Sequence, residues 1–190
     1  MNNNYEEPTN RNDADGSCKQ ISLDSYEALV EALKKVGITI VRPATKDEQV
    51  NEHWDFLVEY KGIQKKLEVK GLKRLNRSDA NRSGSTVVLE WQACRYIDDI
   101  NRPGWIQGKY DIIAFLMDGE FWVFERDTLL NWFISTFNPE NMPVCDSPKY
   151  GKKLHTMYTR KGLDRQPRYD KWLIVLKEEL RKVPHKVWKV

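Results

Sequence analysis

The sequence predicts an α/β (α+β) protein with a mixed central sheet flanked by helices. Helical and strand-like patterns follow one another in the order helix, strand, hairpin, strand, hairpin, helix. Residues 111–116 are almost continuously apolar, as expected for a central strand that is buried on both faces. With 190 residues, of which 40% are hydrophobic, the chain is long enough for one domain with its own core.

Composition argues against several classes of protein. The sequence has no run of 18 apolar residues, so no membrane span is expected, and its N-terminus lacks the apolar core of a signal peptide. The three cysteines, Cys18, Cys94 and Cys145, are widely spaced, and no Cys-x-x-Cys is present. Neither a zinc site nor a disulfide framework is suggested, and we expect free thiols and a cytoplasmic location.

The net charge of +3 conceals an asymmetry along the chain. Residues 1–60 hold 6 Lys and Arg against 12 Asp and Glu, whereas residues 61–190 hold 25 against 16. A positive C-terminal part suits a polyanionic partner such as nucleic acid, although it is also common in proteins that bind none.

The N-terminal part predicts a tail, a helix and a strand. Residues 1–20 are Asn-rich and acidic, and we expect a disordered tail that precedes a single domain over residues 21–190. Asp24 and Glu27 form a capping-box pattern that predicts a helix start, and Gly37 ends the helix. The apolar stripe of this helix comprises Tyr26, Leu29, Val30 and Leu33. A short strand is then expected over residues 38–41, stopped by Pro43.

Residues 53–71 read as two strands joined by a two-residue turn at Lys61–Gly62. This register places Trp54, Phe56, Val58, Tyr60 and Ile63 on one apolar face. On the other face Asp55 lies directly opposite Glu68, and Lys70 follows two residues on. Two carboxylates so close repel one another unless a divalent cation, a shared proton or a lysine lies nearby. The alternative is an exposed sheet face with ordinary charged residues.

The pattern of Asp55, Glu68 and Lys70 resembles the PD-(D/E)XK nuclease superfamily over about residues 22–125. Residues 69–74 are also similar to those of uncharacterised phage-type members. The resemblance implies a restriction-endonuclease-like fold and an Mg²⁺- or Mn²⁺-dependent deoxyribonuclease. By this resemblance, Asp55, Glu68 and the carbonyl of Val69 bind the metal, and Lys70 orients or activates the attacking water. Where the family has Pro, this chain has Trp54, and that departure lowers the specificity of the match.

The resemblance also bears on further ligands and on assembly. In that superfamily a Glu of the first helix sometimes adds a metal ligand, which makes Glu31 a candidate because capping already explains Glu27. The alternative is a solvated Glu31. Related junction resolvases and restriction-type enzymes act as dimers, so the resemblance implies a homodimer by analogy.

Basic residues directly follow the predicted site. Residues 73–85 read as a mobile polar loop. Its candidate phosphate contacts are Lys73, Arg74, Arg77 and Arg82, and the alternative is a solvated surface loop. A strand is expected over residues 86–92, where Glu90 and Gln92 either extend the metal or substrate site or form an ordinary polar face. Tyr96 and Trp105 could stack on bases, but such aromatic residues more often pack.

The C-terminal part predicts a second hairpin across Asp118–Gly119 and a helix from Asp127 to about Phe137. Residues 149–190 form a basic extension, which begins with basic residues interleaved with tyrosines. Its candidate nucleic-acid contacts are Lys152, Lys153, Arg160 and Lys161, and the alternative is a solvated basic face. Residues 168–183 are expected to form an amphipathic helix.

The sequence thus favours a metal-dependent endonuclease that hydrolyses DNA. A non-catalytic nucleic-acid-binding module on the same fold is the first alternative. An unrelated α+β protein that binds an acidic partner is the second.

Overall fold

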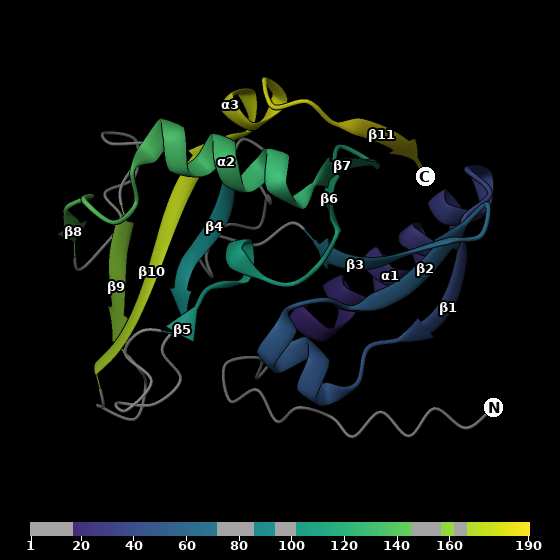
Figure 1. The fold of residues 1–190 in the computed structure, drawn as a ribbon, viewed down its shortest axis with the longest axis horizontal. Helices are drawn as coiled ribbons and strands as arrows, with labels where there is room; N and C mark the ends of the chain where they lie inside the picture. The colour runs from purple at the N-terminus through teal and green to yellow at the C-terminus, as the bar shows by residue number, and fades with distance from the viewer. Residues whose placement is uncertain (1–16, 72–85, 94–101, 146–156, 162–166) are drawn as a thin grey trace.

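The computed structural model describes residues 17–71, 86–93, 102–145, 157–161 and 167–190. The elements are α1 Ser17–Lys35, β1 Thr39–Pro43, π-helix η1 Glu48–Glu52, β2 Phe56–Tyr60, β3 Ile63–Lys70, β4 Thr86–Ala93, β5 Arg102–Pro103, 3₁₀-helix η2 Trp105–Gln107, β6 Ile112–Met117, β7 Glu120–Glu125, α2 Arg126–Phe137, β8 Val144–Cys145, β9 Met157–Lys161, β10 Pro167–Leu176, α3 Lys177–Arg181 and β11 Lys186–Lys189. Figure 1 shows the strands and helices together, and the expected mixed α+β class is confirmed.

The described strands form two sheets. The first has the order β1-β2-β3-β6-β7-β11, in which β3 and β6 run parallel and the other neighbours run antiparallel. The second has the order β5-β4-β10-β9-β8, in which only β8 and β9 run parallel among the described pairs. The first sheet is therefore mixed, as the sequence predicts for the central sheet.

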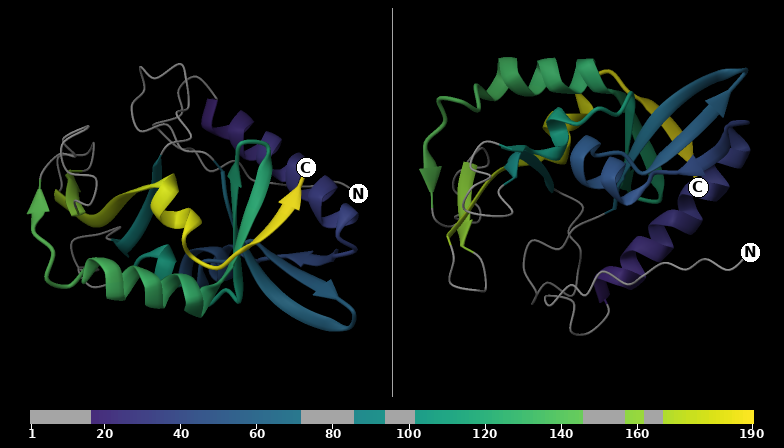
Figure 2. Two further views of the ribbon diagram at one scale, coloured as in Figure 1. Left: turned by 90° about the horizontal axis from the view of Figure 1, so that it is seen from above. Right: turned by 60° about the horizontal axis from the view of Figure 1, so that its bottom comes forward.

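The helices α1 and α2 cover opposite faces of the first sheet, as the right-hand view of Figure 2 shows. Leu29 and Leu33 of α1 pack with Val58 and Leu67 of the hairpin in one core cluster. The other cluster lies beneath α2 and includes residues of both sheets. Its members include Leu129 and Phe133 of α2, Ile113 and Phe124 of the first sheet, and Leu89, Leu173 and Val175 of the second. The helix α2 thus holds the two sheets together.

The predicted β2–β3 hairpin is confirmed in turn and in register. Phe56 pairs with Leu67, and Tyr60 pairs with Ile63. Lys61 and Gly62 have φ values of 51° and 79°, and a two-residue turn with two positive φ values matches the right-handed twist of its strands. Glycine supplies one of these conformations without steric cost.

The predicted helix over residues 168–183 is wrong. The chain forms strand β10 up to Leu176, and only Lys177–Arg181 is helical. Leu173 and Val175 are buried between the sheets and α2, whereas Trp172 and Ile174 are half-buried. Alternate burial is the strand period, and the bulky residues 172–176 favour a strand when β4 and β9 are available on both sides.

The first helix begins earlier than its capping pattern predicts. It starts at Ser17, so Asp24 lies inside the helix. The intervening residues include Lys19, Gln20 and Leu23, which have good helix propensity and let the helix extend. Residues 1–16 of the expected tail lie outside the described residues. None of the described helices is long and apolar enough to cross a membrane.

Candidate active site

Asp55 and Glu68 lie together at the open end of the β2–β3 hairpin. The backbone N–H of Asp55 donates to the carbonyl of Leu67 at 2.8 Å, so strand pairing continues one residue beyond β2. Oδ2 of Asp55 accepts a hydrogen bond from the N–H of Val69 at 2.9 Å. The Asp55 carboxylate is therefore fixed against the backbone that carries Glu68.

Glu68 is buried in the sheet face that α2 covers. It is 4% exposed, and β3 places it beside Ile113 of β6. The ammonium of Lys70 forms an ion pair with the Glu68 carboxylate and lies 4.9 Å from the ring centre of Trp105. Glu68 is thus not part of a solvated sheet face, which was the alternative interpretation of the sequence pattern.

The charges of this cluster depend on one another. Burial raises the pKa of Glu68, Lys70 opposes the rise, and Asp55 adds to it through its charge and a shared hydrogen bond. Burial alone would lower the pKa of Lys70, but Glu68 and Asp55, together with Glu90, raise it above its ordinary value. Lys70 is consequently a persistent ammonium between acidic groups.

Tyr110 is a buried residue near enough to the cluster for the charge of Glu68 to act on it. It is 1% exposed, and its hydroxyl donates to the carbonyl of Ile106 at 3.2 Å. Burial, followed by the charge of Glu68, raises the pKa of Tyr110, so its hydroxyl stays protonated and neutral.

The donor atoms at this site suit a hard divalent cation. Two carboxylates and a backbone carbonyl are oxygen ligands of the kind that Mg²⁺ and Mn²⁺ prefer. Within the described residues, no group of three or more His, Cys, Asp or Glu side chains is placed to hold a metal. An ion held by Asp55 and Glu68 would therefore complete its shell largely with water, as Mg²⁺ commonly does.

Trp54 does not share the face of Phe56, so this part of the predicted apolar face is wrong. Trp54 lies between His53, which caps the end of η1 with φ 58°, and Phe56, where β2 begins, so the strand alternation does not extend back to it. Trp54 is fully buried in the core cluster beneath α2, and its Nε1 donates to Glu52 at 2.9 Å. The guanidinium carbon of Arg42 lies 5.0 Å from the Trp54 ring centre, and Nζ of Lys66 lies 5.2 Å from it.

The structure does not bring Glu31 to this site. Glu31 lies on an exposed part of α1, where its carboxylate pairs with Lys34 at 2.8 Å. The apolar side of α1 packs on the face of the sheet opposite Glu68. Glu27 is exposed on the same helix. Glu31 therefore matches its alternative, a solvated glutamate.

Glu90 approaches the site from the second sheet. It lies on β4, half-buried and directly opposite Trp172, and its charge acts on Lys70. Gln92 follows on the same strand. Glu90 thus lies near the lysine, although it does not join Asp55 and Glu68 in a three-acid metal group among the described residues.

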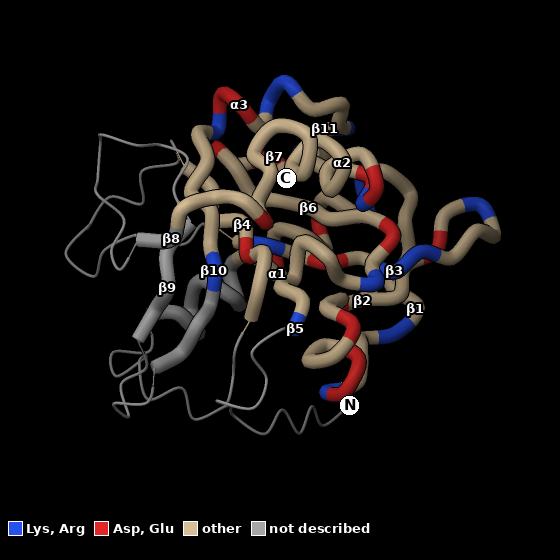
Figure 3. Tube along the Cα trace, turned by 60° about the vertical axis from the view of Figure 1, so that its left-hand side comes forward, with Lys and Arg blue, Asp and Glu red and all other residues tan. Residues whose placement is uncertain are grey.

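The predicted phosphate-binding residues fall largely outside the described ranges. These are Lys73, Arg74, Arg77, Arg82, Lys152 and Lys153. Arg160 and Lys161 lie on β9, whose backbone pairs with β10. Figure 3 shows that, among the described residues, Lys and Arg are spread over elements that include α3, β10, β5 and the hairpin.

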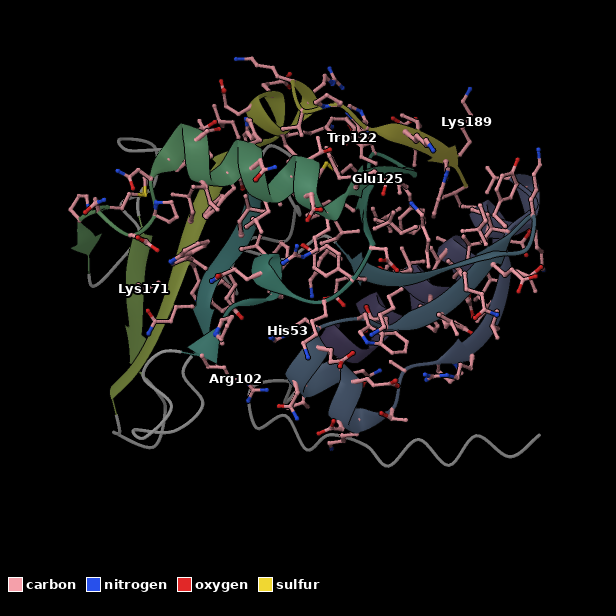
Figure 4. All side chains as sticks on the ribbon, in the orientation of Figure 1. His53, Arg102, Trp122, Glu125, Lys171 and Lys189 are labelled. Atoms are coloured by element: carbon pink, nitrogen blue, oxygen red, sulfur yellow. The ribbon has the colours of Figure 1, made fainter. Side chains whose placement is uncertain are left out.

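Sequence reasoning missed several residues that support the site. Glu52 joins the ends of the hairpin, because its carboxylate accepts from Lys66 at 2.7 Å as well as from Trp54. Arg102 of β5 donates to the carbonyl of Val50, and Figure 4 shows Arg102 and His53 where the second sheet meets η1. Trp105 packs in the core and is not exposed for stacking on bases, which were its two interpretations. No signal in the sequence indicated its contact with Lys70.

The fold and the site define an α+β protein with two carboxylates and a lysine at the end of a central strand. No protein-family description matches the chain. No curated protein matches it either. Among solved structures, the chain is similar to the bacterial homing endonuclease I-Ssp6803I, with 18% identity and a TM-score of 0.44, over 61% of this chain and 74% of that chain.

Proposed function

We propose that this chain is a metal-dependent endonuclease of the PD-(D/E)XK type that hydrolyses phosphodiester bonds in DNA. The observation that carries the proposal is the burial of Glu68 beside Asp55, with the Lys70 ammonium in contact with it. A buried acid beside a second, half-buried acid is costly for stability, and such arrangements are concentrated at functional sites. DNA is favoured over other polyanions by the resemblance and by the positive charge of residues 61–190.

Each residue of the site has a distinct role in the proposal. Asp55 and Glu68 hold Mg²⁺ or Mn²⁺, and Val69 contributes its carbonyl. The ion would supply charge neutralisation and a water of lowered pKa. Lys70, whose ammonium contacts Glu68, donates hydrogen bonds to the attacking water or to the scissile phosphate. The raised pKa of Tyr110 leaves its hydroxyl neutral beside these charged groups.

The test is cleavage of plasmid, linear single-stranded and branched DNA with Mg²⁺ or Mn²⁺, beside an EDTA control. The wild type should cut at least one substrate, and Lys70→Ala and Asp55→Asn should each lower the rate by roughly 10²–10³-fold. The sequence offers a matched control in Lys61→Ala, because Glu59-Tyr60-Lys61 repeats the Glu-x-Lys pattern at the hairpin turn, where Lys61 is exposed. Lys61→Ala should cut like the wild type.

Two outcomes would contradict the proposal. Salt-sensitive DNA binding in EDTA with no cutting on any substrate would leave a binding module on the same fold. Cutting that survives Lys70→Ala and Asp55→Asn would place the reaction elsewhere in the chain. Thermal unfolding of each variant checks that a lost activity is not a lost fold. A homodimer stays a prediction, which sedimentation with and without DNA would check.

A further inference from the structure

Trp105 lies over Lys70 because a short segment docks tightly on the second sheet. Gly104 precedes it, and a Cβ on Gly104 would lie 2.3 Å from the carbonyl oxygen of Glu90, so only glycine permits this approach. The N–H of Gly104 and the side-chain amide of Gln107 both donate to the carbonyl of Trp91, at 2.9 Å and 2.6 Å. The helix η2, and Trp105 with it, is thereby fixed to β4.

The indole of Trp105 is held on both sides. It is 4% exposed, and its ring centre lies 5.9 Å from that of Phe115. Nζ of Lys70 lies 4.9 Å from the ring centre, within the range of a cation–π contact. The lysine ammonium therefore lies between the Glu68 carboxylate and an aromatic ring.

The indole nitrogen of Trp105 distinguishes it from two other buried tryptophans. Nε1 of Trp54 donates to Glu52, and Nε1 of Trp122 donates to Glu120, each at 2.9 Å. Nε1 of Trp105 is buried and has no acceptor among the described residues. Buried donors are usually paired with an acceptor. Because the N–H of Trp105 is not, a hydrogen bond from this N–H does not explain why the position holds a tryptophan. The face of the ring, which contacts Lys70, is the part of Trp105 that meets the site.

We propose that Trp105 is a positioning residue for Lys70. This inference rests on the proposed function and deepens it. A lysine ammonium is a point charge on a flexible four-carbon stem. In the present arrangement Glu68 and Trp105 both hold it. When Glu68 is engaged by a divalent cation, the carboxylate is shared, and the ring of Trp105 keeps the ammonium over the site.

The first test does not depend on cleavage. In protein labelled with ¹³C at the lysine ε-carbon, the Lys70 resonance is identified by its loss in Lys70→Arg. Its methylene protons should be displaced upfield by the ring current of Trp105, with and without Mg²⁺. Trp105→Phe should keep most of the displacement, because a ring face remains, whereas Trp105→Leu should abolish it. An undisplaced resonance in the wild type, or equal displacement in Trp105→Leu, would overturn the inference.

The second test separates positioning from substrate contact. Trp105→Leu should lower kcat by roughly 10²-fold with little change in KM, because a misplaced catalytic group costs turnover. Trp105→Phe should stay within about tenfold of the wild type. In a Lys70→Ala background, Trp105→Leu should have no further effect. A rise in KM alone, or a full additional loss in the Lys70→Ala background, would contradict a role through Lys70.

Trp132→Leu is the matched control for the loss of an indole. Trp132 is half-buried on α2, and its ring centre lies 5.2 Å from that of Phe137. This variant should lose thermal stability but keep the Lys70 resonance and kcat. If Trp105→Leu does not fold, Trp105→Phe and the wild-type resonance still decide the inference. If the wild type cuts no DNA, the proposed function fails, and the resonance still shows whether Trp105 holds Lys70.

Discussion

Trp54 lies between two elements, outside the regular alternation of β2. The π-helix η1 is capped at its end by His53, whose φ is 58°, and β2 begins only at Phe56. A positive φ at a histidine is uncommon and leaves no reliable signal in the sequence. The register of Asp55 and Glu68 was predictable, because it depends on a two-residue turn and on period two alone.

The contacts that surround these acids could not be predicted in the same way. Trp105 and Glu90 reach Lys70 from segments far along the chain, through the docking of a second sheet. Glu68 is buried on the face of the first sheet that α2 covers. A residue's local pattern fixes its face but not what later covers that face.

At the residue scale, Glu52 should make stability depend on acid pH. Hydrogen bonds from Lys66 and then Trp54 lower the pKa of Glu52 to about 2. A lowered pKa stabilises the fold above the unfolded value of 4.5, and this contribution is lost as the pH falls from there toward about 2. Urea unfolding should show Glu52→Gln to be less stable than the wild type at pH 7, with a smaller difference at pH 3. An equal difference at both pH values would contradict the assignment.

At the scale of elements, strands with strong turns were the most predictable. The hairpins across Lys61–Gly62 and Asp118–Gly119 both form as expected. The error at β10 has a physical cause, since residues 168–183 satisfy a helical stripe as well as a strand pattern. Its partner β4 is distant in sequence, and only the completed sheet decides between the two periods.

The docking of η2 predicts the effect of Gly104→Ala. The added Cβ would meet the backbone of Glu90 at 2.3 Å, so either β4 or η2 must move. We expect a loss of about 1–3 kcal/mol in the free energy of unfolding and a drop in DNA cleavage, because Trp105 shifts with η2.

Gly119→Ala separates these two effects. Gly119 has φ 79°, and a Cβ there meets open space, so only conformational strain of about 1–2 kcal/mol is expected. Thermal unfolding should show both variants to be destabilised, while cleavage should fall in Gly104→Ala alone. Equal cleavage by the two variants would show that the site does not depend on η2.

At the scale of the whole molecule, an ion pair links the two sheets. Lys177 follows β10 directly and is 7% exposed, and its ammonium contacts Asp118 in the β6–β7 turn. The same ammonium lies 5.4 Å from the ring centre of Trp122 on β7. Lys177 thus contacts the first sheet at the β6–β7 turn, and further along the chain β11 pairs with β7 of the same sheet.

Asp118→Asn should weaken this link without disturbing the turn, because Asn also tolerates a positive φ. We expect the free energy of unfolding to fall by about 1–2 kcal/mol, since one partner is buried and the other is largely exposed. Asp127→Asn is the control, because Asp127 pairs with Arg126 and is 81% exposed. Urea unfolding should show little change for Asp127→Asn, and an equally small change for Asp118→Asn would mean that the link contributes no stability.

The tight turn at Lys61–Gly62 also has a consequence for chain entropy. The loss of entropy on closing a loop grows with the logarithm of its length. Asp55 and Glu68 are joined by one short closure, whereas Trp105 reaches Lys70 only when β4 and η2 are in place. The acid pair is therefore the part of the site that the chain assembles with the least loss of entropy, and the cover over Lys70 is the part that loosening of the second sheet would remove first.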